Sequence, residues 1–437
     1  MPIMQRKYSN PVLIVKKCIQ GNRMNKYVEK IYGVVPNTNK EIDIKLNGRN
    51  LIITGSNGSG KTCLLREFNR KTDLLIAQKK IADRESIETS IQYYEKSLKT
   101  SQKGTSQYER DQNNLERYKK QIDEINFGLT IAFTDYLSFS SKLDDRRAVL
   151  RLFEAQRKSE ISSANTARGL ETEKALVQNQ KKNQQKNQQL GNNLEQHLVN
   201  LRNRRSLAIT EDKNYSLADK IDHWFAEFEE DLRQLLEDNT AKLNFNSDTL
   251  KFTIFQDSKP EYTFQSLSSG YKAIFDIYAD LLMRTEYFDI TPKELTGIVF
   301  IDEIDAHLHV SLQRLIFPFF TKSFPNIQFI VTTHSPFVLM SAQDTIIFDL
   351  TKNEQIDEDI SLYSHTSVIK GLLGTKTTSA RLEEYVNEIA TIVNTDNVNY
   401  ERLEVLVRKL RSVENTLDSQ SKAFYLMGEN ALLDKEQ

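Results

Sequence analysis

One eight-residue segment, Gly55–Thr62, constrains this chain more than any other feature. It reads Gly-Ser-Asn-Gly-Ser-Gly-Lys-Thr, follows the apolar run Leu51–Ile53, and precedes apolar residues at helical spacing (Leu64, Leu65 and Phe68). A glycine-rich turn between a buried strand and a helix lets successive backbone N–H groups point inward, where they bind phosphate. The alternative is a glycine turn that precedes Lys-Thr by chance, and the flanking strand and helix argue against it. We therefore expect a nucleotide-binding loop.

The residue types within this loop predict how it binds its ligands. Lys61 is expected to reach the β- and γ-phosphates, and the Thr62 hydroxyl is expected to coordinate Mg²⁺. The predicted cofactors are ATP and Mg²⁺. The predicted nucleotide-binding residues of the loop are Asn57, Gly58, Ser59, Gly60, Lys61 and Thr62.

Composition and charge exclude some classes of protein. The 437 residues include 59 Lys and Arg against 60 Asp and Glu, so the whole-chain charge favours neither the presence nor the absence of nucleic acid. The two cysteines, Cys18 and Cys63, lie far apart in the sequence, which argues against a cysteine zinc site and fits a reducing compartment. No secretory leader and no apolar run of membrane length is evident. We expect a cytoplasmic protein without membrane contact.

Apolar periodicity predicts mixed secondary structure in the first third of the chain. Short strands separated by turns are expected at Val12–Ile19, Tyr27–Val35, Ile42–Leu46 and Leu51–Thr54, and again at Leu129–Phe133 and Ala148–Phe153. Between residues 74 and 125, apolar residues at helical spacing flank a polar break that contains Gly104. This pattern predicts an antiparallel helical hairpin, with helices of about 25 residues that project roughly 35–40 Å.

A polar tract at residues 174–206 is rich in Gln and Asn, and it holds seven basic residues and a single acid, Glu195. Composition leaves open a second helical arm or a partly disordered loop. Its basicity makes it our candidate for a DNA or RNA contact, although such runs are more often simply solvated. Further on we expect an amphipathic helix at Ile221–Leu236, a β-hairpin at Lys242–Phe255, helices at Ala380–Val393 and Tyr400–Val413, and a polar tail.

Candidate catalytic residues follow two apolar strands in the second half of the chain. Gly297–Ile301 ends in Asp302, which suits Mg²⁺ coordination, and Glu303, which is placed to polarise an attacking water. Ile327–Thr332 precedes His334. A histidine at a strand exit is usually an ordinary surface residue. We expect the strands that carry the phosphate loop and the two carboxylates to be neighbours, so that His334 senses the γ-phosphate.

A second anion cradle is predicted at Leu267–Lys272, directly before a helix. Ser268, Ser269 and Gly270 would place hydroxyl and backbone N–H groups at the helix N-terminus. One nucleotide does not need two cradles from the same chain. We therefore expect this cradle to bind the nucleotide of a second subunit in a homodimer.

Together these segments resemble the motifs of ABC-type ATPase heads. Gly55–Thr62 is similar to Walker A, Leu267–Lys272 to the signature, Ile298–Glu303 to Walker B with its catalytic Glu, His334 to the switch histidine, and Asp305–Leu308 to the D-loop. The resemblance also makes Gln156 our candidate for a Q-loop residue near Mg²⁺. The signature departs from the transporter pattern, with Ser269 and Tyr271 where Gly and Gln are usual. In this respect the chain resembles the branch of SMC, RecF and OLD-type ATPases.

Within that branch the chain resembles the PtuA family of antiphage ATPases, found in Septu and some retron systems. The resemblance rests on Walker B through Leu339, on a strand at Thr345–Leu350, and on Ser367–Gly374 followed by helices. It implies an oligomeric ATPase that acts with a separate HNH nuclease, PtuB, which ATP binding restrains. The alternatives are an SMC- or RecF-like repair ATPase that binds DNA directly and an ABC transporter subunit. The helical insertions and the signature oppose the transporter.

The predicted fold class is α/β. We expect an ABC-type P-loop ATPase head with an antiparallel β-subdomain, helical-hairpin (short coiled-coil) insertions and a helical C-terminal region. The expected parts are the β-subdomain with Walker A (1–73), a helical hairpin (74–126), head strands with the Q-loop (127–158), a helical or low-complexity arm (159–240), the remaining head motifs (241–350) and a partner-binding C-terminal region (351–437).

Overall fold

This computed structural model describes residues 26–435, except 39, 158–160, 165, 180–188, 359, 361–362, 364–366, 369–370, 372–378 and 396–397. The chain divides into two compact units, Met1–Tyr363 and Ser364–Gln437. The strand predicted at Val12–Ile19 and most of the segment Ser367–Gly374 lie outside the described residues. No helix in the described ranges combines the length and the apolar character that a membrane span requires.

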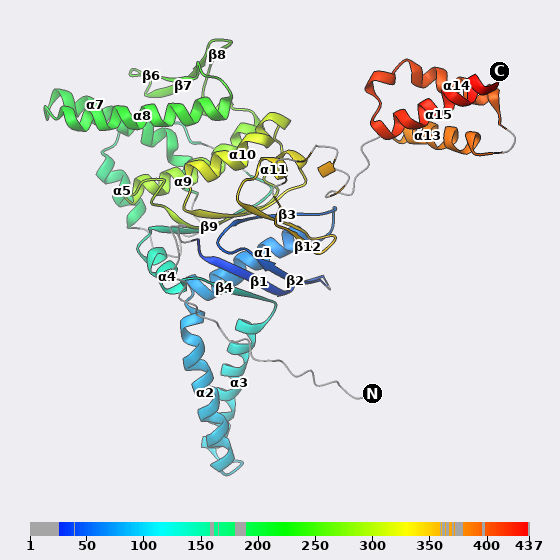
Figure 1. Ribbon diagram of the computed structural model, residues 1–437. Coiled ribbons are helices and arrows are strands. Elements are labelled where there is room, and N and C mark those ends of the chain that lie inside the picture. The colour runs from blue at the N-terminus through cyan, green and yellow to red at the C-terminus, as the bar shows by residue number, and fades with distance from the viewer. Residues whose placement is uncertain are drawn as a thin grey trace. The chain divides into compact units, whose positions relative to one another are not determined.

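A six-stranded sheet forms the centre of the first unit (Figure 1). In spatial order its strands are β12 (Glu354–Ile356), β11 (Thr345–Asp349), β3 (Asn50–Thr54), β10 (Ile327–Thr332), β9 (Thr296–Ile301) and β5 (Ala148–Phe153). All neighbouring pairs are parallel except β11 and β12. Every residue of β3, β10 and β11 is buried. A parallel sheet covered on both faces therefore explains the continuous apolar runs in the sequence.

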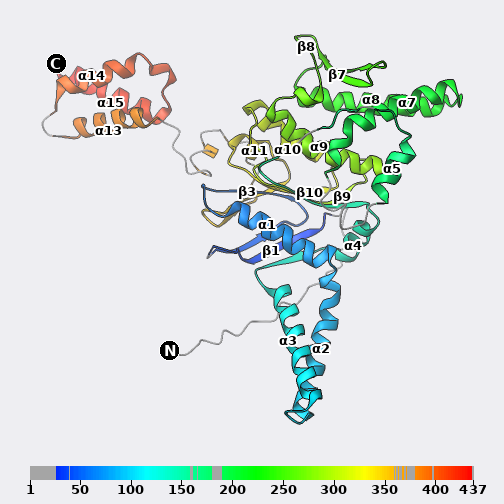
Figure 2. The same ribbon diagram turned by 180° about the vertical axis from the view of Figure 1, so that it is seen from behind.

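Helix α1 (Lys61–Thr72) lies between this sheet and a smaller antiparallel sheet (Figure 2). The smaller sheet consists of β2 (Glu41–Lys45), β1 (Val28–Val34) and β4 (Leu129–Phe133), in that order. Phe68 of α1 is fully buried and meets Phe300 of β9 edge to face at 5.1 Å. Helices α9 (Ser269–Tyr287), α10 (Val310–Ser323) and α11 (Pro336–Ser341) lie beyond the opposite face of the six-stranded sheet (Figures 1 and 2). The predicted α/β head with an antiparallel β-subdomain is confirmed.

The predicted helical hairpin is confirmed and leaves the head at the end of α1 (Figure 1). A π-helical turn, Asp73–Ala77, leads into α2 (Lys80–Thr100), which packs antiparallel to α3 (Ser106–Asn126). Each helix has 21 residues, which corresponds to about 32 Å, slightly shorter than expected. At its root, the buried Lys71 of α1 donates to the carbonyls of Glu124, at 3.2 Å, and Phe127, at 2.6 Å. Burial lowers the pKa of Lys71 to about 8.

Several further helices of the first unit lie on the side of the head away from the hairpin (Figure 1). They are α5 (Leu170–Gln178), a 3-10 turn (Leu190–Asn193), α7 (Leu194–Thr210) and α8 (Tyr215–Leu236), followed by the antiparallel strands β6 (Lys242–Asn246), β7 (Lys251–Gln256) and β8 (Lys259–Tyr262). The predicted amphipathic helix and β-hairpin correspond to α8 and to β6–β7. Helix α4 (Tyr136–Asp144) precedes β5, and a 3-10 turn (Phe264–Ser266) precedes α9.

The described part of the polar tract 174–206 is helical and largely paired. Its described basic residues face carboxylates: Lys174 with Asp289, Arg202 and Arg205 with Asp222, and Arg204 with Asp212. His197 and Asn200 of the tract are buried. Lys181, Lys182 and Lys186 of the tract lie outside the described residues, so the nucleic-acid contact through this tract stays a prediction.

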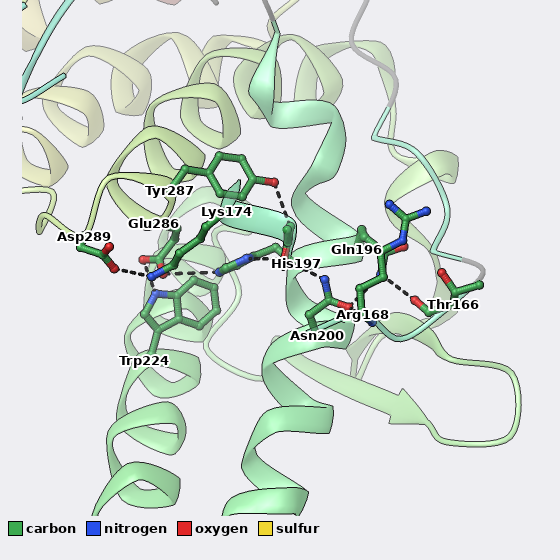
Figure 3. A network of polar contacts seen from close by, with 11 residues as sticks. Thr166, Arg168, Lys174, Gln196, His197, Asn200, Trp224, Glu286, Tyr287 and Asp289 are labelled. Carbon is green, nitrogen blue, oxygen red and sulfur yellow. Dashed lines mark hydrogen bonds and ion pairs between the residues drawn. The ribbon is translucent and has the colours of Figure 1, made fainter. Parts of the chain in front are cut away.

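A buried polar network centred on His197 joins the helices of this region (Figure 3). The ring lies 3.3 Å from Glu173 of α5 through Nδ1 and 3.4 Å from Glu286 of α9 through Nε2. Glu173 also accepts hydrogen bonds from Asn200 at 2.7 Å and from the Tyr287 hydroxyl at 2.8 Å, while Trp224 of α8 donates to Glu286 at 2.8 Å. Burial disfavours the charged imidazolium, but the two carboxylates outweigh it and raise the pKa of His197 to about 9.

This raised pKa predicts a pH-dependent stability. Because the folded pKa lies above the ordinary value of 6.5, the stabilisation is complete below pH ~6.5 and is lost as pH rises toward ~9, with an upper limit on the order of 3 kcal/mol. We expect the thermal unfolding midpoint to fall over this range, and the His197→Gln variant to lose most of that dependence. The matched control is His223→Gln, since the His223 side chain is 76% exposed. Equal pH dependence in wild type and His197→Gln would contradict the prediction.

In the described part of the second unit, three helices form a bundle. They are α13 (Ala380–Val393), α14 (Tyr400–Arg411) and α15 (Ser419–Lys435), with a 3-10 turn at Glu414–Thr416. The predicted polar tail is wrong, because α15 buries Tyr425 in the core of the bundle. A Cβ at Gly428 would lie 2.9 Å from Val407, so α15 packs closely on α14. The predicted start of the C-terminal region at residue 351 is also too early, since β12 belongs to the central sheet and the second unit begins at Ser364.

Candidate active site

Four adjacent parallel strands of the central sheet carry the candidate site residues at their carboxyl ends. β3 leads into Gly55–Thr62, β10 into His334, β9 into Asp302 and Glu303, and β5 into Gln156. Carboxyl ends of parallel strands meet at one edge of a sheet, where ligands bind in open α/β folds. The prediction that β3 and β9 are neighbours is wrong, because β10 pairs with both of them. The strand that carries His334 therefore lies between the phosphate loop and the two carboxylates.

The backbone of the phosphate loop adopts conformations that favour glycine. Gly55, Gly58 and Gly60 have φ values of 139°, 74° and 101°. A Cβ at Gly58 would meet nothing within 4 Å, so this part of the loop faces open space. The loop is held from outside by Thr351, whose hydroxyl accepts from the backbone N–H of Ser56 at 2.7 Å. No sequence pattern predicted this support from the segment that follows β11.

Two polar side chains of the loop fit an anionic ligand. The Lys61 ammonium is buried and donates to the carbonyls of Gly55, at 3.1 Å, and Ser56, at 3.0 Å. Burial lowers its pKa, and the negative charges of Glu303, Asp302, Asp305 and Asp349 oppose that shift. The Ser59 hydroxyl is buried and has no hydrogen-bond partner among the described residues. A phosphate group would supply acceptors to both side chains, so the donor set fits the predicted nucleotide.

The oxygens of Thr62 and Asp302 meet where a metal ion is expected. The Thr62 hydroxyl donates to Asp302 Oδ1 at 3.1 Å, and the Thr332 hydroxyl donates to the same oxygen at 2.7 Å. Asp302 is only 2% exposed. A hydroxyl and a carboxylate are oxygen ligands of the kind that Mg²⁺ prefers, with further positions left to phosphate and water. These two side chains fit the predicted metal site.

Glu303 is presented by a tight turn directly after β9. Its φ is +45°, a left-handed conformation that is uncommon for a residue with a side chain. Its backbone N–H donates to the Thr332 hydroxyl at 2.7 Å. Arg157 donates to the carbonyls of Asp302, at 2.8 Å, and Glu303, at 2.9 Å. The neighbouring Gln156 side chain, which was the predicted metal contact, is exposed, so the structure brings Arg157 to this turn.

His334 is partly buried and electrostatically linked to Lys61. Burial lowers the pKa of the imidazole, the positive charge of Lys61 lowers it further, and Asp305 and Glu303 oppose the shift. The imidazole is therefore neutral at pH 7, with one N–H to donate to a phosphate oxygen.

The second cradle lies at the start of α9. Ser268 is the N-cap residue, and both Ser268 and Ser269 are exposed. A Cβ at Gly270 would lie 2.9 Å from the carbonyl oxygen of His307, so α9 begins in close contact with the segment that resembles a D-loop. The cradle is thus open to an approaching ligand and backed by the turn that follows Glu303.

A known protein family matches the part of the chain that contains this site. Residues 51–341 match the family described as "AAA domain, putative AbiEii toxin, Type IV TA system". The chain belongs to this family. The matched region contains the phosphate loop, both carboxylates, His334 and the second cradle.

Curated relatives match over shorter stretches. The chain is 48% identical to "Retron Ec83 probable ATPase" of Escherichia coli over 92 residues, or 20% of this chain and 17% of that protein. It is 31% identical to "Septu protein PtuA" of Bacillus thuringiensis over 134 residues, or 30% of this chain and 33% of that protein. The predicted resemblance to this group is confirmed, and the chain spans a third or less of the length of these relatives.

One solved structure that the chain matches is the SMC head bound to the C-terminal winged-helix domain of ScpA. The match covers 75% of this chain and 96% of that chain, with 13% identity and a TM-score of 0.34.

Proposed function

We propose that this protein is an ATP-hydrolysing regulator of a bacterial antiphage defence system, and that it controls a separate HNH nuclease of the PtuB type. The observation that carries the proposal is the arrangement at one sheet edge of the phosphate loop, the Asp302–Glu303 turn and His334. The family match and the names of the relatives, which include retron ATPases and Septu PtuA, support it.

Each candidate residue has a role in this proposal that its position supports. Lys61 and the loop N–H groups bind the phosphates, while Thr62 and Asp302 hold Mg²⁺, which supplies charge neutralisation at the phosphates when bound. Glu303 accepts a proton from the attacking water, and His334 donates its N–H to the γ-phosphate. Gln156 remains the Q-loop candidate, and a contact with Mg²⁺ requires its exposed side chain to turn inward.

The exposed side chains of Ser268 and Ser269 in the second cradle support the proposed dimerisation. Two chains in head-to-tail arrangement would enclose two ATP molecules, each between the phosphate loop of one chain and the cradle of the other. Small hydroxyl side chains and backbone N–H groups at the start of a helix suit a γ-phosphate. Formation of the homodimer, or of a larger homo-oligomer built from it, would then depend on ATP.

The helical bundle at residues 364–437 is the proposed contact for the nuclease. It is a separate compact unit, and its surface exposes several apolar side chains, namely Val405, Val413, Leu426, Met427 and Leu433. These five side chains are the proposed contact residues for the nuclease.

A pull-down from the native host tests the proposed function. Tagged Glu303→Gln protein, purified with ATP present, is expected to retain a small nuclease in stoichiometric amount, identified by mass. Deletion of residues 364–437 should release it. Lys61→Ala, which removes the ammonium from the phosphate loop, serves as the nucleotide-free control. Absence of any partner, together with ATP hydrolysis stimulated by DNA ends, would replace the proposal with a repair ATPase that binds DNA directly.

A further inference from the structure

Arg157 is a partly buried cation that the proposed chemistry does not yet use. It follows β5, the strand next to β9, and its Nη2 donates to two successive carbonyls, those of Asp302 at 2.8 Å and Glu303 at 2.9 Å. Both acceptors belong to the turn that presents the two candidate carboxylates. A guanidinium is a rigid planar donor, so it fixes the position of the backbone that it binds.

The turn at Glu303 requires such support. A left-handed backbone at a residue with a side chain costs roughly 1 kcal/mol or more, and it persists only where the surroundings hold it. Here the strands on both sides of β9 hold it: the Thr332 hydroxyl of β10 accepts the N–H of Glu303, and Arg157 binds its carbonyl. The direction of the Glu303 side chain therefore depends on these two contacts.

Arg157 also interacts electrostatically with Asp276 of helix α9, whose N-terminus carries the second cradle. Burial lowers the pKa of Arg157, and among the negative charges that oppose this shift Asp276 of α9 has the largest effect. Asp276 Oδ1 and Arg157 Nε are both buried, and within the described part of the chain neither has a hydrogen-bond partner. Burial raises the pKa of Asp276 to about 6, so the carboxyl is mostly ionised at neutral pH. A donor and an acceptor of opposite charge that influence each other electrostatically thus both lie buried without a hydrogen bond among the described residues.

We propose that Arg157 is a positioning residue for ATP hydrolysis, which holds the Asp302–Glu303 turn and connects it through Asp276 to the helix that carries the second cradle. When the nucleotide of the second subunit occupies the cradle, a shift of α9 changes the electrostatic attraction between Asp276 and Arg157. The orientation of Glu303 then responds to dimer formation. This inference rests on the proposed function, in which Glu303 is the general base.

Substitution of Arg157 tests the positioning role. Arg157→Gln is expected to lower kcat roughly 10- to 100-fold, the effect of a small misplacement of a reacting group, while KM for ATP changes less than about 3-fold. Arg146→Gln is the matched control, because Arg146 also donates to a backbone carbonyl, that of Gln178 at 3.0 Å, but precedes β5. The control should keep its kcat. A parallel loss of kcat in both variants, or an unchanged kcat in Arg157→Gln, would overturn the inference.

Arg157→Lys keeps the buried charge and can still reach a carbonyl, and it is the variant to use where Arg157→Gln does not fold. It is expected to show an intermediate kcat at an unchanged KM.

A double-mutant cycle separates the positioning role from a general loss of structure. If Arg157 acts through Glu303, single-turnover hydrolysis of radiolabelled ATP by Arg157→Gln/Glu303→Gln should be no slower than by Glu303→Gln alone. A further drop in the double variant would contradict action through Glu303. Likewise, Asp276→Asn should have no added effect in the Arg157→Gln background, and an additive loss would contradict the connection to α9. Normal turnover by Glu303→Gln itself would instead refute the assignment of Glu303 as the general base in the proposed function.

Discussion

Replacing Glu303 with Gln is expected to slow ATP hydrolysis by roughly 100-fold or more while ATP binding is retained. The amide has nearly the same shape as the carboxylate and can keep the backbone contacts of the turn, but it cannot take a proton from water. The turn itself depends on backbone groups, the N–H and the carbonyl of Glu303, which the substitution leaves in place. Phosphate release under single-turnover conditions and equilibrium binding of ATP measure the two properties separately.

Glu154→Gln is the control for this experiment. Glu154 follows β5 at the same edge of the sheet, but it is exposed and pairs with Arg66 at 2.6 Å. Its substitution changes the local charge equally and should leave hydrolysis within about 3-fold of wild type, as expected for an exposed ion pair. Turnover of Glu303→Gln at the wild-type rate would remove Glu303 as the general base and leave the site without an assigned proton acceptor.

The sequence predicted the site residues that belong to recognisable local motifs. The phosphate loop combines glycine spacing, an apolar strand and a helix, and each of these is a short-range signal. Asp302 and Glu303 were found in the same way, at the end of an apolar run. The hairpin α2–α3 followed from helical periodicity, because its two helices pack mainly on each other.

Features that depend on long-range packing were not visible in the sequence. The insertion of β10 between β3 and β9 is a matter of topology, which no local pattern encodes. Thr332, which binds both Asp302 and the N–H of Glu303, lies inside an apolar strand where its hydroxyl gave no signal. Arg157 lies next to Gln156, and no sequence pattern indicated that it binds the Asp302–Glu303 turn. The helix α15 was missed because its apolar residues do not follow one face, with Tyr425 buried and Leu426 exposed.

Ser269→Arg is expected to abolish ATP-dependent dimerisation while each chain still binds ATP. Ser269 is exposed at the first turn of α9, one residue after the N-cap Ser268. The cradle can accept a γ-phosphate only if the side chains at this point are small, and a guanidinium on a three-carbon stem fills the space that the phosphate requires. The phosphate loop of the same chain is unchanged, so binding of the first nucleotide should persist. Sedimentation of Glu303→Gln and Ser269→Arg/Glu303→Gln with ATP measures the difference.

The same substitution should also reduce hydrolysis by orders of magnitude, because the γ-phosphate would lose its contacts from the second chain. Ser247→Arg, in the exposed turn between β6 and β7, adds an equal charge away from the cradle and should preserve both the dimer and its activity. Dimerisation and normal turnover by Ser269→Arg would show that the start of α9 does not bind the nucleotide of a partner. In that case Ser268–Gly270 would be only a helix N-terminus. The proposed connection from α9 through Asp276 to Glu303 would then not respond to a nucleotide bound by a second subunit.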